Sequence, residues 1–136
     1  PAKLDFAFSI LLPLFSAKKL FSAATVARLS LSFLHFREYH NFNEADNSRV
    51  NAAVFDTLKS GGTYVVIDHT RRHMQQETGT LGRREDPVDV ILQVQAAGFV
   101  LDRVSDMFFQ ASDDLSQEVG QIPNMTDRFF LVFKKP

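Results

Sequence analysis

Side chains able to move a proton occur as neighbours at two places in the chain. Tyr39 and His40 form one pair, and Asp68 and His69 form the other, directly after a β-branched and aromatic run at 63–67. Histidine has an ordinary pKa that suits a general base near neutral pH. His40 and His69 are therefore candidate bases. Each also fits a structural histidine, and Asp68 also fits a hydrogen bond to the backbone of the next loop.

The same residue types offer metal ligands, but their context does not support a metal site. Asp68, His69 and His73 supply suitable atoms, and a separation of four residues would place the two histidines on one face of a helix. Their surroundings are polar and contain Gly79 and Gly82, which predicts a loop. We therefore expect no metal site.

Composition excludes several classes of protein. The chain has 136 residues, 45% hydrophobic and 23% charged, as in one ordinary globular domain. It has no cysteine, which excludes disulfides, zinc fingers and thiol catalysis. It also lacks a GxSxG turn and a phosphate-binding loop with its lysine. The net charge of −1 disfavours a nucleic-acid partner, because such proteins usually carry a basic excess.

The elements that must position the candidate bases are a helix and a strand. A helix is predicted from 46–48 to Gly61, because Val54 and its neighbours recur at helical spacing and glycine suits a helix end. A buried strand follows at 63–68 and ends in Asp68. The polar stretch at 69–85 is predicted to be a loop.

A second helix and two strands complete the pattern. Asp86 and Pro87 are typical of a helix start, and Gly98 ends this helix. Strands are predicted at 99–105 and 128–134. Alternating strands and helices favour a parallel sheet, and the last two strands, with no helix between them, predict an antiparallel edge.

The first 36 residues differ in composition, because they carry few charges. The apolar run at 4–10 predicts a buried strand, with the core of a signal peptide at 6–17 as the alternative. A helix is predicted at 14–34. Basic residues interrupt every stretch long enough to cross a bilayer, so we expect no membrane span.

Several motifs stand in the order found in one enzyme family. They are Tyr39-His40-Asn41-Phe42, Leu58-Lys59-Ser60-Gly61-Gly62, Tyr64-Val65-Val66-Ile67-Asp68-His69, Ala96-Ala97-Gly98-Phe99, Thr126-Asp127-Arg128-Phe129 and Phe133-Lys134-Lys135-Pro136. Over residues 36–136 this order resembles the C-terminal half of class I S-adenosylmethionine-dependent methyltransferases, in particular their bacterial-type "predicted methyltransferase" subgroup. The resemblance implies an α/β fold, the C-terminal part of a doubly wound (Rossmann-like) sheet with an antiparallel edge strand.

The resemblance also implies a function and a set of site residues. The expected reaction is transfer of a methyl group from S-adenosylmethionine to a small molecule that the sequence does not identify. The residues expected at the site are His40 and His69 as catalytic groups, Tyr39, Asp68 and Arg84 as substrate contacts, and Arg37 and Tyr39 as cofactor contacts. The arginines of the loop at 69–86 would select an anionic acceptor, with a solvated loop as the simpler alternative.

The sequence departs from the family in its first part. No Gly-rich GxGxG turn is present, so about half of the family's cofactor site is missing. Residues 1–9 resemble the family's fourth strand, and 10–35 are interpreted as an atypical insertion or a translated intron ahead of the C-terminal half at 36–136. We therefore expect a fragment that is inactive alone and binds the cofactor without micromolar affinity.

A non-enzymatic function is the alternative. The chain would then be a degenerate half-domain that binds a partner chain. Truncation of the family's sheet beside its fourth strand would expose an apolar edge, and such edges favour self-association.

Overall fold

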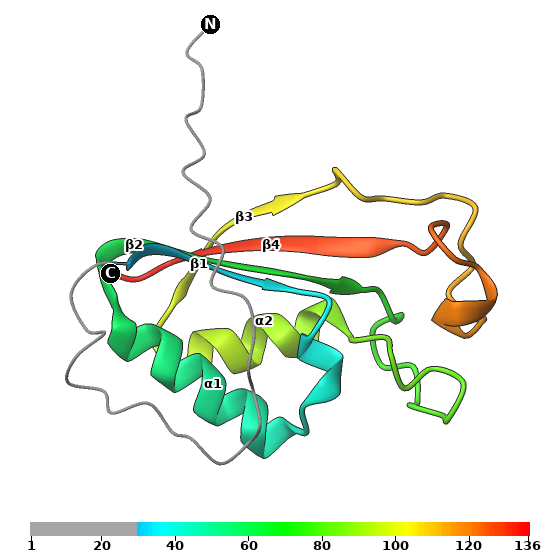
Figure 1. The fold of residues 1–136 in the computed structure, drawn as a ribbon, viewed down its shortest axis with the longest axis horizontal. Helices are drawn as coiled ribbons and strands as arrows, with labels where there is room; N and C mark the ends of the chain where they lie inside the picture. The colour runs from blue at the N-terminus through cyan, green and yellow to red at the C-terminus, as the bar shows by residue number, and fades with distance from the viewer. Residues whose placement is uncertain (1–29) are drawn as a thin grey trace, which may run out of the picture.

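The computed structural model describes residues 30–136, which form one four-stranded sheet with helices on one face (Figure 1). The strands are ordered β1-β2-β4-β3; β1 runs parallel to β2, and β4 runs antiparallel to both of its neighbours. In chain order the elements are β1 (Ser30–Phe36), η1 (Tyr39–Asn41), α1 (Glu44–Thr57), β2 (Leu58–His69), α2 (Pro87–Ala96), β3 (Val100–Ser105), η2 (Val119–Gln121) and β4 (Arg128–Lys134).

The core lies between this sheet and the two helices. Alternate residues of β2 and β4, such as Tyr64 and Phe133, point toward the helices and are fully buried. Val54 of α1 and Val90 and Val94 of α2 pack against them. Burial of these apolar side chains is the main force that holds both helices on the sheet.

The fold class implied by the resemblance is confirmed. The structure is a mixed α/β fold, and β3 at the edge of the described sheet pairs antiparallel with β4. The strand that runs against the others is β4, which lies inside the sheet between β2 and β3. No helix in the described part of the chain has the length and apolar character needed to cross a membrane.

Helix α1 differs from its prediction at both ends. It begins at Glu44 because the side chain of Asn43 accepts a hydrogen bond from the Asp46 N–H, earlier than the predicted start at 46–48. It ends at Thr57 because Leu58 is extended, four residues before Gly61. The Lys135 ammonium donates to the Leu58 carbonyl over 2.8 Å and so replaces the expected glycine cap.

Helix α2 and the last strand were predicted correctly. The Asp86 side chain accepts a hydrogen bond from the Val88 N–H, and Pro87 occupies the first turn. Gly98 has a φ of +105°, which a side chain would disfavour at the end of this helix. The bounds of β4 match the predicted strand at 128–134.

The N-terminal predictions fall largely outside the described residues. The predicted strand at 1–9 and most of the predicted insertion lie there. The last part of that insertion, 30–35, belongs to β1, so the expected helix at 14–34 is wrong over residues 30–34. The strand directly before Tyr39 is therefore Ser30–Phe36, with two residues between it and η1.

Candidate functional site

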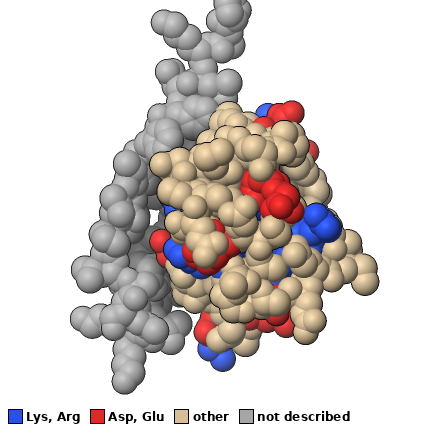
Figure 2. Space-filling model, turned by 90° about the vertical axis from the view of Figure 1, so that its right-hand side faces the viewer, with Lys and Arg blue, Asp and Glu red and all other residues tan. Residues whose placement is uncertain are grey.

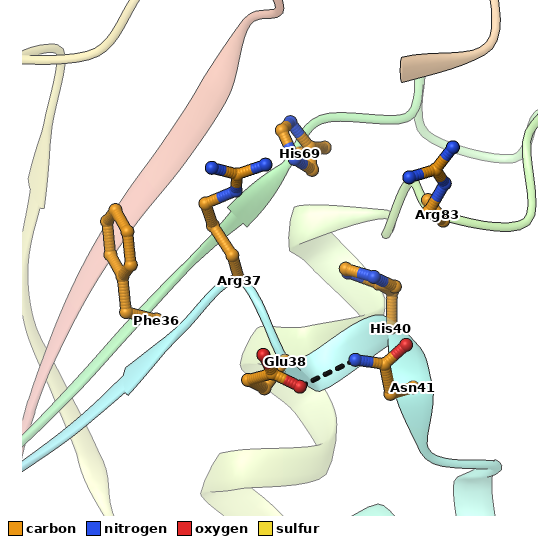
Figure 3. A pocket seen from close by; sticks show the side chains of 7 residues that line it. All are labelled: Phe36, Arg37, Glu38, His40, Asn41, His69 and Arg83. Atoms are coloured by element: carbon orange, nitrogen blue, oxygen red, sulfur yellow. Dashed lines mark hydrogen bonds between the residues drawn. The ribbon is translucent and has the colours of Figure 1, made fainter. Parts of the chain in front are cut away.

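The candidate site lies at the carboxyl ends of β1 and β2. These strands are parallel and in register, with Phe36 opposite Ile67, so the segments that follow them emerge side by side. An open pocket of about 430 Å³ lies at this edge. In open α/β sheets, ligands bind in such a position. The residues that line the pocket are Phe36, Arg37, Glu38, His40, Asn41, His69 and Arg83 (Figure 3).

Asp68 and His40 form a hydrogen-bonded pair beside this pocket. The Nδ1 atom of His40 lies 2.9 Å and 3.0 Å from the two carboxylate oxygens of Asp68. The backbone N–H groups of His40 and His69 donate to the same carboxylate over 3.0 Å and 2.8 Å. Because an ionised carboxylate only accepts hydrogen bonds, Nδ1 of His40 must be the donor. The neutral ring then has its free lone pair on Nε2.

His69 is the second predicted base, and its surroundings favour a neutral ring. It is only 1% exposed. Burial lowers its pKa to about 4; Asp68 partly offsets this effect, and Arg37 and Arg128 add to it. The Nδ1 atom has no hydrogen-bond partner within the described chain. A neutral imidazole of this kind is a weak base but a usable hydrogen-bond donor or acceptor.

Tyr39 lies in the core and is not among the residues that line the pocket. Its side chain is fully buried, which raises the pKa of the hydroxyl to about 12. The hydroxyl donates to Gln93 Oε1 and accepts from Asn51 Nδ2, each over 2.9 Å. Asn51 in turn accepts from the Tyr64 hydroxyl over 3.0 Å. The predicted contacts of Tyr39 with substrate and cofactor stay a prediction. The network favours a different function, in which Tyr39 anchors the segment that carries His40.

The Asn51 network gives a direct test of what holds this segment. Replacement of Asn51 by alanine leaves the buried Tyr64 hydroxyl without its acceptor. We expect the free energy of unfolding to fall by about 1–3 kcal/mol, measured by urea denaturation. Ser48→Ala, on an exposed position of the same helix, is the control and should change it by less than about 0.5 kcal/mol. Equal effects of the two substitutions would contradict this account of the network.

Arg84 lies away from the pocket, in a buried ion pair. Its guanidinium donates to both carboxylate oxygens of Asp113 over 2.9 Å and 3.0 Å, and both side chains are 0% exposed. It also donates to the carbonyls of Thr70 and Gln117. Burial opposes the charge on Asp113, but bonds from Arg84 and from the Asp127 and Leu115 N–H groups outweigh it and lower the pKa. The predicted substrate contact stays untested, and all these bonds favour a structural role.

Arg37, predicted as a cofactor contact, does line the pocket. It has a φ of +56°, an uncommon left-handed conformation for arginine, directly after β1. Its backbone N–H donates to the Ile67 carbonyl over 2.8 Å, which ties the turn to β2. The guanidinium extends toward His69 (Figure 3). Strained backbone conformations often occur at functional sites.

Glu85 is a residue that sequence reasoning missed. Burial raises the pKa of its carboxyl to about 7; Arg71 opposes the shift and Asp68 adds to it. Its backbone N–H donates to the His69 carbonyl over 2.8 Å, which places the segment beside the end of β2. In the sequence, Glu85 has the pattern of a solvated loop acid. The position of Glu85 beside the end of β2 depends on a β-bridge between Thr70 and Glu85, which the sequence does not indicate.

One group of side chains has the spacing of metal ligands, but a helix cap explains it. His73, Asp86 and Asp89 lie within 4.8 Å of one another. Asp86 is already bonded to the Val88 and Met74 N–H groups and to His73 Nδ1. Of the earlier candidate set, His73 is bonded to Asp86 and Asp68 is bonded to His40, whereas Nδ1 of His69 has no hydrogen-bond partner in the described chain.

Comparison with solved structures identifies the fold. Neither family models nor curated proteins match the sequence. The structure resembles human N-acetylserotonin methyltransferase in complex with S-adenosylmethionine (TM-score 0.55, 13% identity, 77% of this chain and 29% of that chain). It also resembles the methyltransferase CalO1 of calicheamicin biosynthesis, bound to S-adenosylhomocysteine (0.51, 16%, 78% and 30%), and the [4+2]-cyclase SpnF (0.56, 13%, 77% and 49%).

The extent of these matches is informative. The chain spans 29%, 30% and 49% of the lengths of these three proteins, so it matches only part of each. The described part of the chain has the fold seen in these S-adenosylmethionine-dependent methyltransferases, and it covers about a third of their length.

Proposed function

We propose that this chain is the acceptor-side half of a methyltransferase that transfers a methyl group from S-adenosylmethionine to a small molecule. The observation that carries the proposal is the Asp68–His40 pair beside a pocket at the carboxyl ends of β1 and β2. The fold alone does not decide the reaction, because one structural neighbour is a cyclase. The side chains in the pocket supply the further support.

In this proposal His40 is the general base. When bound, S-adenosylmethionine supplies a methyl group on a sulfonium sulfur. Asp68 holds the proton of His40 on Nδ1, so Nε2 is free to take the proton of the acceptor's hydroxyl or amine. The methyl group would pass from the sulfonium sulfur, which would be left as a thioether, to the acceptor, and His40 would hold the proton that the acceptor gives up. The main contribution of the protein is alignment.

The described residues fit only part of the cofactor. Arg37 and His69 could hold the carboxylate of its methionine part, since both line the pocket and the buried Nδ1 of His69 has no partner in the described chain. Within 30–136 the glycines with left-handed φ values are Gly61 and Gly98, and neither lies at the carboxyl end of β1 or β2. A Gly-rich cradle for the remainder of the cofactor is therefore missing from this part.

Nuclear magnetic resonance of the histidine rings tests the proposal. The chain has four histidines, so their ring signals are few enough to assign. We expect millimolar S-adenosylhomocysteine to shift the signals of His40 and His69 saturably and to leave those of His73 unchanged. We also expect calorimetry to show no micromolar binding, because the Gly-rich turn is absent. His40 should be in its Nδ1–H tautomer.

The outcomes separate clearly. Saturable shifts confined to His40 and His69 support the proposal. Shifts of equal size at His73, or no shift at any histidine, would overturn it. A micromolar calorimetric isotherm would instead overturn our expectation that the first half of the cofactor site is needed for tight binding.

A second candidate function is that of a half-domain that binds a partner chain. Among the described strands, β1 pairs only with β2, so one of its edges has no strand neighbour there. Its Phe33, Leu34 and Phe36 side chains are 38%, 47% and 42% exposed. Sedimentation analysis separates the candidates, because a partner-binding half-domain associates through this edge with no dependence on the ligand.

A further inference from the structure

Two arginines and a histidine lie together at the end of the sheet. His69 is the last residue of β2 and is directly opposite Arg128 in the pairing with β4. On the other side of His69, Arg37 follows β1 and is bonded through its N–H to Ile67. Burial and the positive charge of Arg37 both lower the pKa of Arg128.

These side chains lack partners in the described part of the chain. Arg49, Arg71, Arg83 and Arg84 all form ion pairs with acids. Among the described residues no such pair is found for Arg37 or Arg128, nor for the exposed Arg72 and Arg103. Nε of Arg128 and Nδ1 of His69 are buried without a hydrogen-bond partner. Buried donors without partners cost free energy, so a polar ligand that satisfies them is favoured.

The local charge fits a singly charged anion. Arg37 and Arg128 contribute two positive charges, and the nearby Asp68 carboxylate offsets one of them. His69 is neutral at neutral pH. The surrounding face carries acidic and basic side chains intermixed, with no continuous basic surface (Figure 2). This pattern suits a small monoanion better than a phosphate dianion or a nucleic acid.

We propose that Arg37, His69 and Arg128 form a binding site for a carboxylate. A carboxylate matches the planar fork of a guanidinium and can accept a further bond from an imidazole N–H. Arg37 and His69 line the pocket together with Phe36 and His40, whereas Arg128 lies opposite His69 on β4 and lines a second pocket. A carboxylate held by Arg37 and His69 therefore places the body of its molecule beside the proposed base. This proposal depends on the proposed function in one respect only. The proposed function determines whether the carboxylate belongs to the methyl acceptor or to the cofactor.

Benzoate is a suitable probe, because it carries a carboxylate on an aromatic ring that can pack against Phe36. We expect millimolar benzoate to shift the ring signals of His69 saturably, and benzamide, its uncharged analogue, to have no saturable effect. Arg37→Gln and Arg128→Gln should each weaken benzoate binding at least about fivefold, in line with loss of one charge-assisted hydrogen bond. Arg103→Gln, at an exposed position on β3, is the matched control and should alter binding less than twofold.

The proposal would be overturned if benzamide bound as tightly as benzoate. It would also be overturned if Arg37→Gln and Arg128→Gln bound benzoate as tightly as Arg103→Gln does. Thermal unfolding of each variant shows whether the fold is retained. Arg37 is exposed and lies outside the strands, so Arg37→Gln should not disturb the fold. Weaker benzoate binding by this variant therefore cannot be explained by misfolding.

Two further ligands identify the source of the carboxylate. S-adenosylhomocysteine has a carboxylate, and 5′-methylthioadenosine lacks it. If Arg37→Gln weakens only the first of these, the site holds the methionine part of the cofactor. If it weakens benzoate and leaves S-adenosylhomocysteine unchanged, the site holds the acceptor. Absence of any response to S-adenosylhomocysteine would contradict the proposed function, while the benzoate result would still decide on the carboxylate site.

Discussion

Replacement of Arg84 by methionine is expected to lower the free energy of unfolding by about 3–5 kcal/mol. The substitution keeps much of the side-chain volume but leaves the Asp113 carboxylate buried without its counter-charge. It also removes the donor to the Thr70 and Gln117 carbonyls. A loss of this size is a large fraction of the stability of an ordinary domain. Urea denaturation followed by circular dichroism measures it.

The neighbouring arginine provides a matched control. Arg83 forms an ion pair with Glu118 and is largely exposed. Arg83→Gln should change the free energy of unfolding by less than about 1 kcal/mol, because exposed ion pairs contribute little. We infer that the buried pair holds the loop after β2 to the segment before β4. A change of less than about 1 kcal/mol in the free energy of unfolding of Arg84→Met would contradict this inference.

Replacement of Asp68 by asparagine is expected to slow the proposed methyl transfer by about 10²- to 10⁴-fold. The amide no longer provides two acceptor oxygens for His40 Nδ1 and the two backbone N–H groups. The His40 ring then loses the interaction that fixes its proton on Nδ1. Turnover is to be measured in an extended protein in which an added Gly-rich first half completes the cofactor site, and His40→Gln should give a loss of similar size.

A structural readout distinguishes this role from simple loss of folding. In the wild-type chain the ¹⁵N spectrum should show His40 mainly as the Nδ1–H tautomer, and in Asp68→Asn as a mixture. Asp102→Asn, at an exposed position on β3, should affect neither the tautomer nor the rate. Retention of full activity by Asp68→Asn would remove His40 as the oriented base.

Local patterns in the sequence predicted much of the second half of the fold. The helix start at Asp86, its end at Gly98 and the strand at 128–134 all depend on residues close to one another in the chain. The early part was predicted less well. The start of α1 depends on Asn43, a local cap that lies before the predicted start at 46–48, and its end depends on Lys135, which is far away in sequence.

The candidate site shows the same division. Residue types identified His40 and Asp68 separately, but only the parallel pairing of β1 with β2 brings them into contact. Tyr39 and Arg84 have the side chains of ligand contacts, and their burial depends on Asn51 and Asp113, partners that no local pattern indicates. Arg128, within a strand motif, gains its proposed role only by lying opposite His69.

The position of β4 has a consequence for how the protein is made. β3 pairs with β4 and with no other described strand, and β2 meets β3 only through it. During synthesis, β2 and β3 therefore leave the ribosome before the strand that joins them exists. Until residues 128–134 emerge, the edges of β2 and β3 that pair with β4 have no strand neighbour. This interval is when the chain most needs protection by a chaperone.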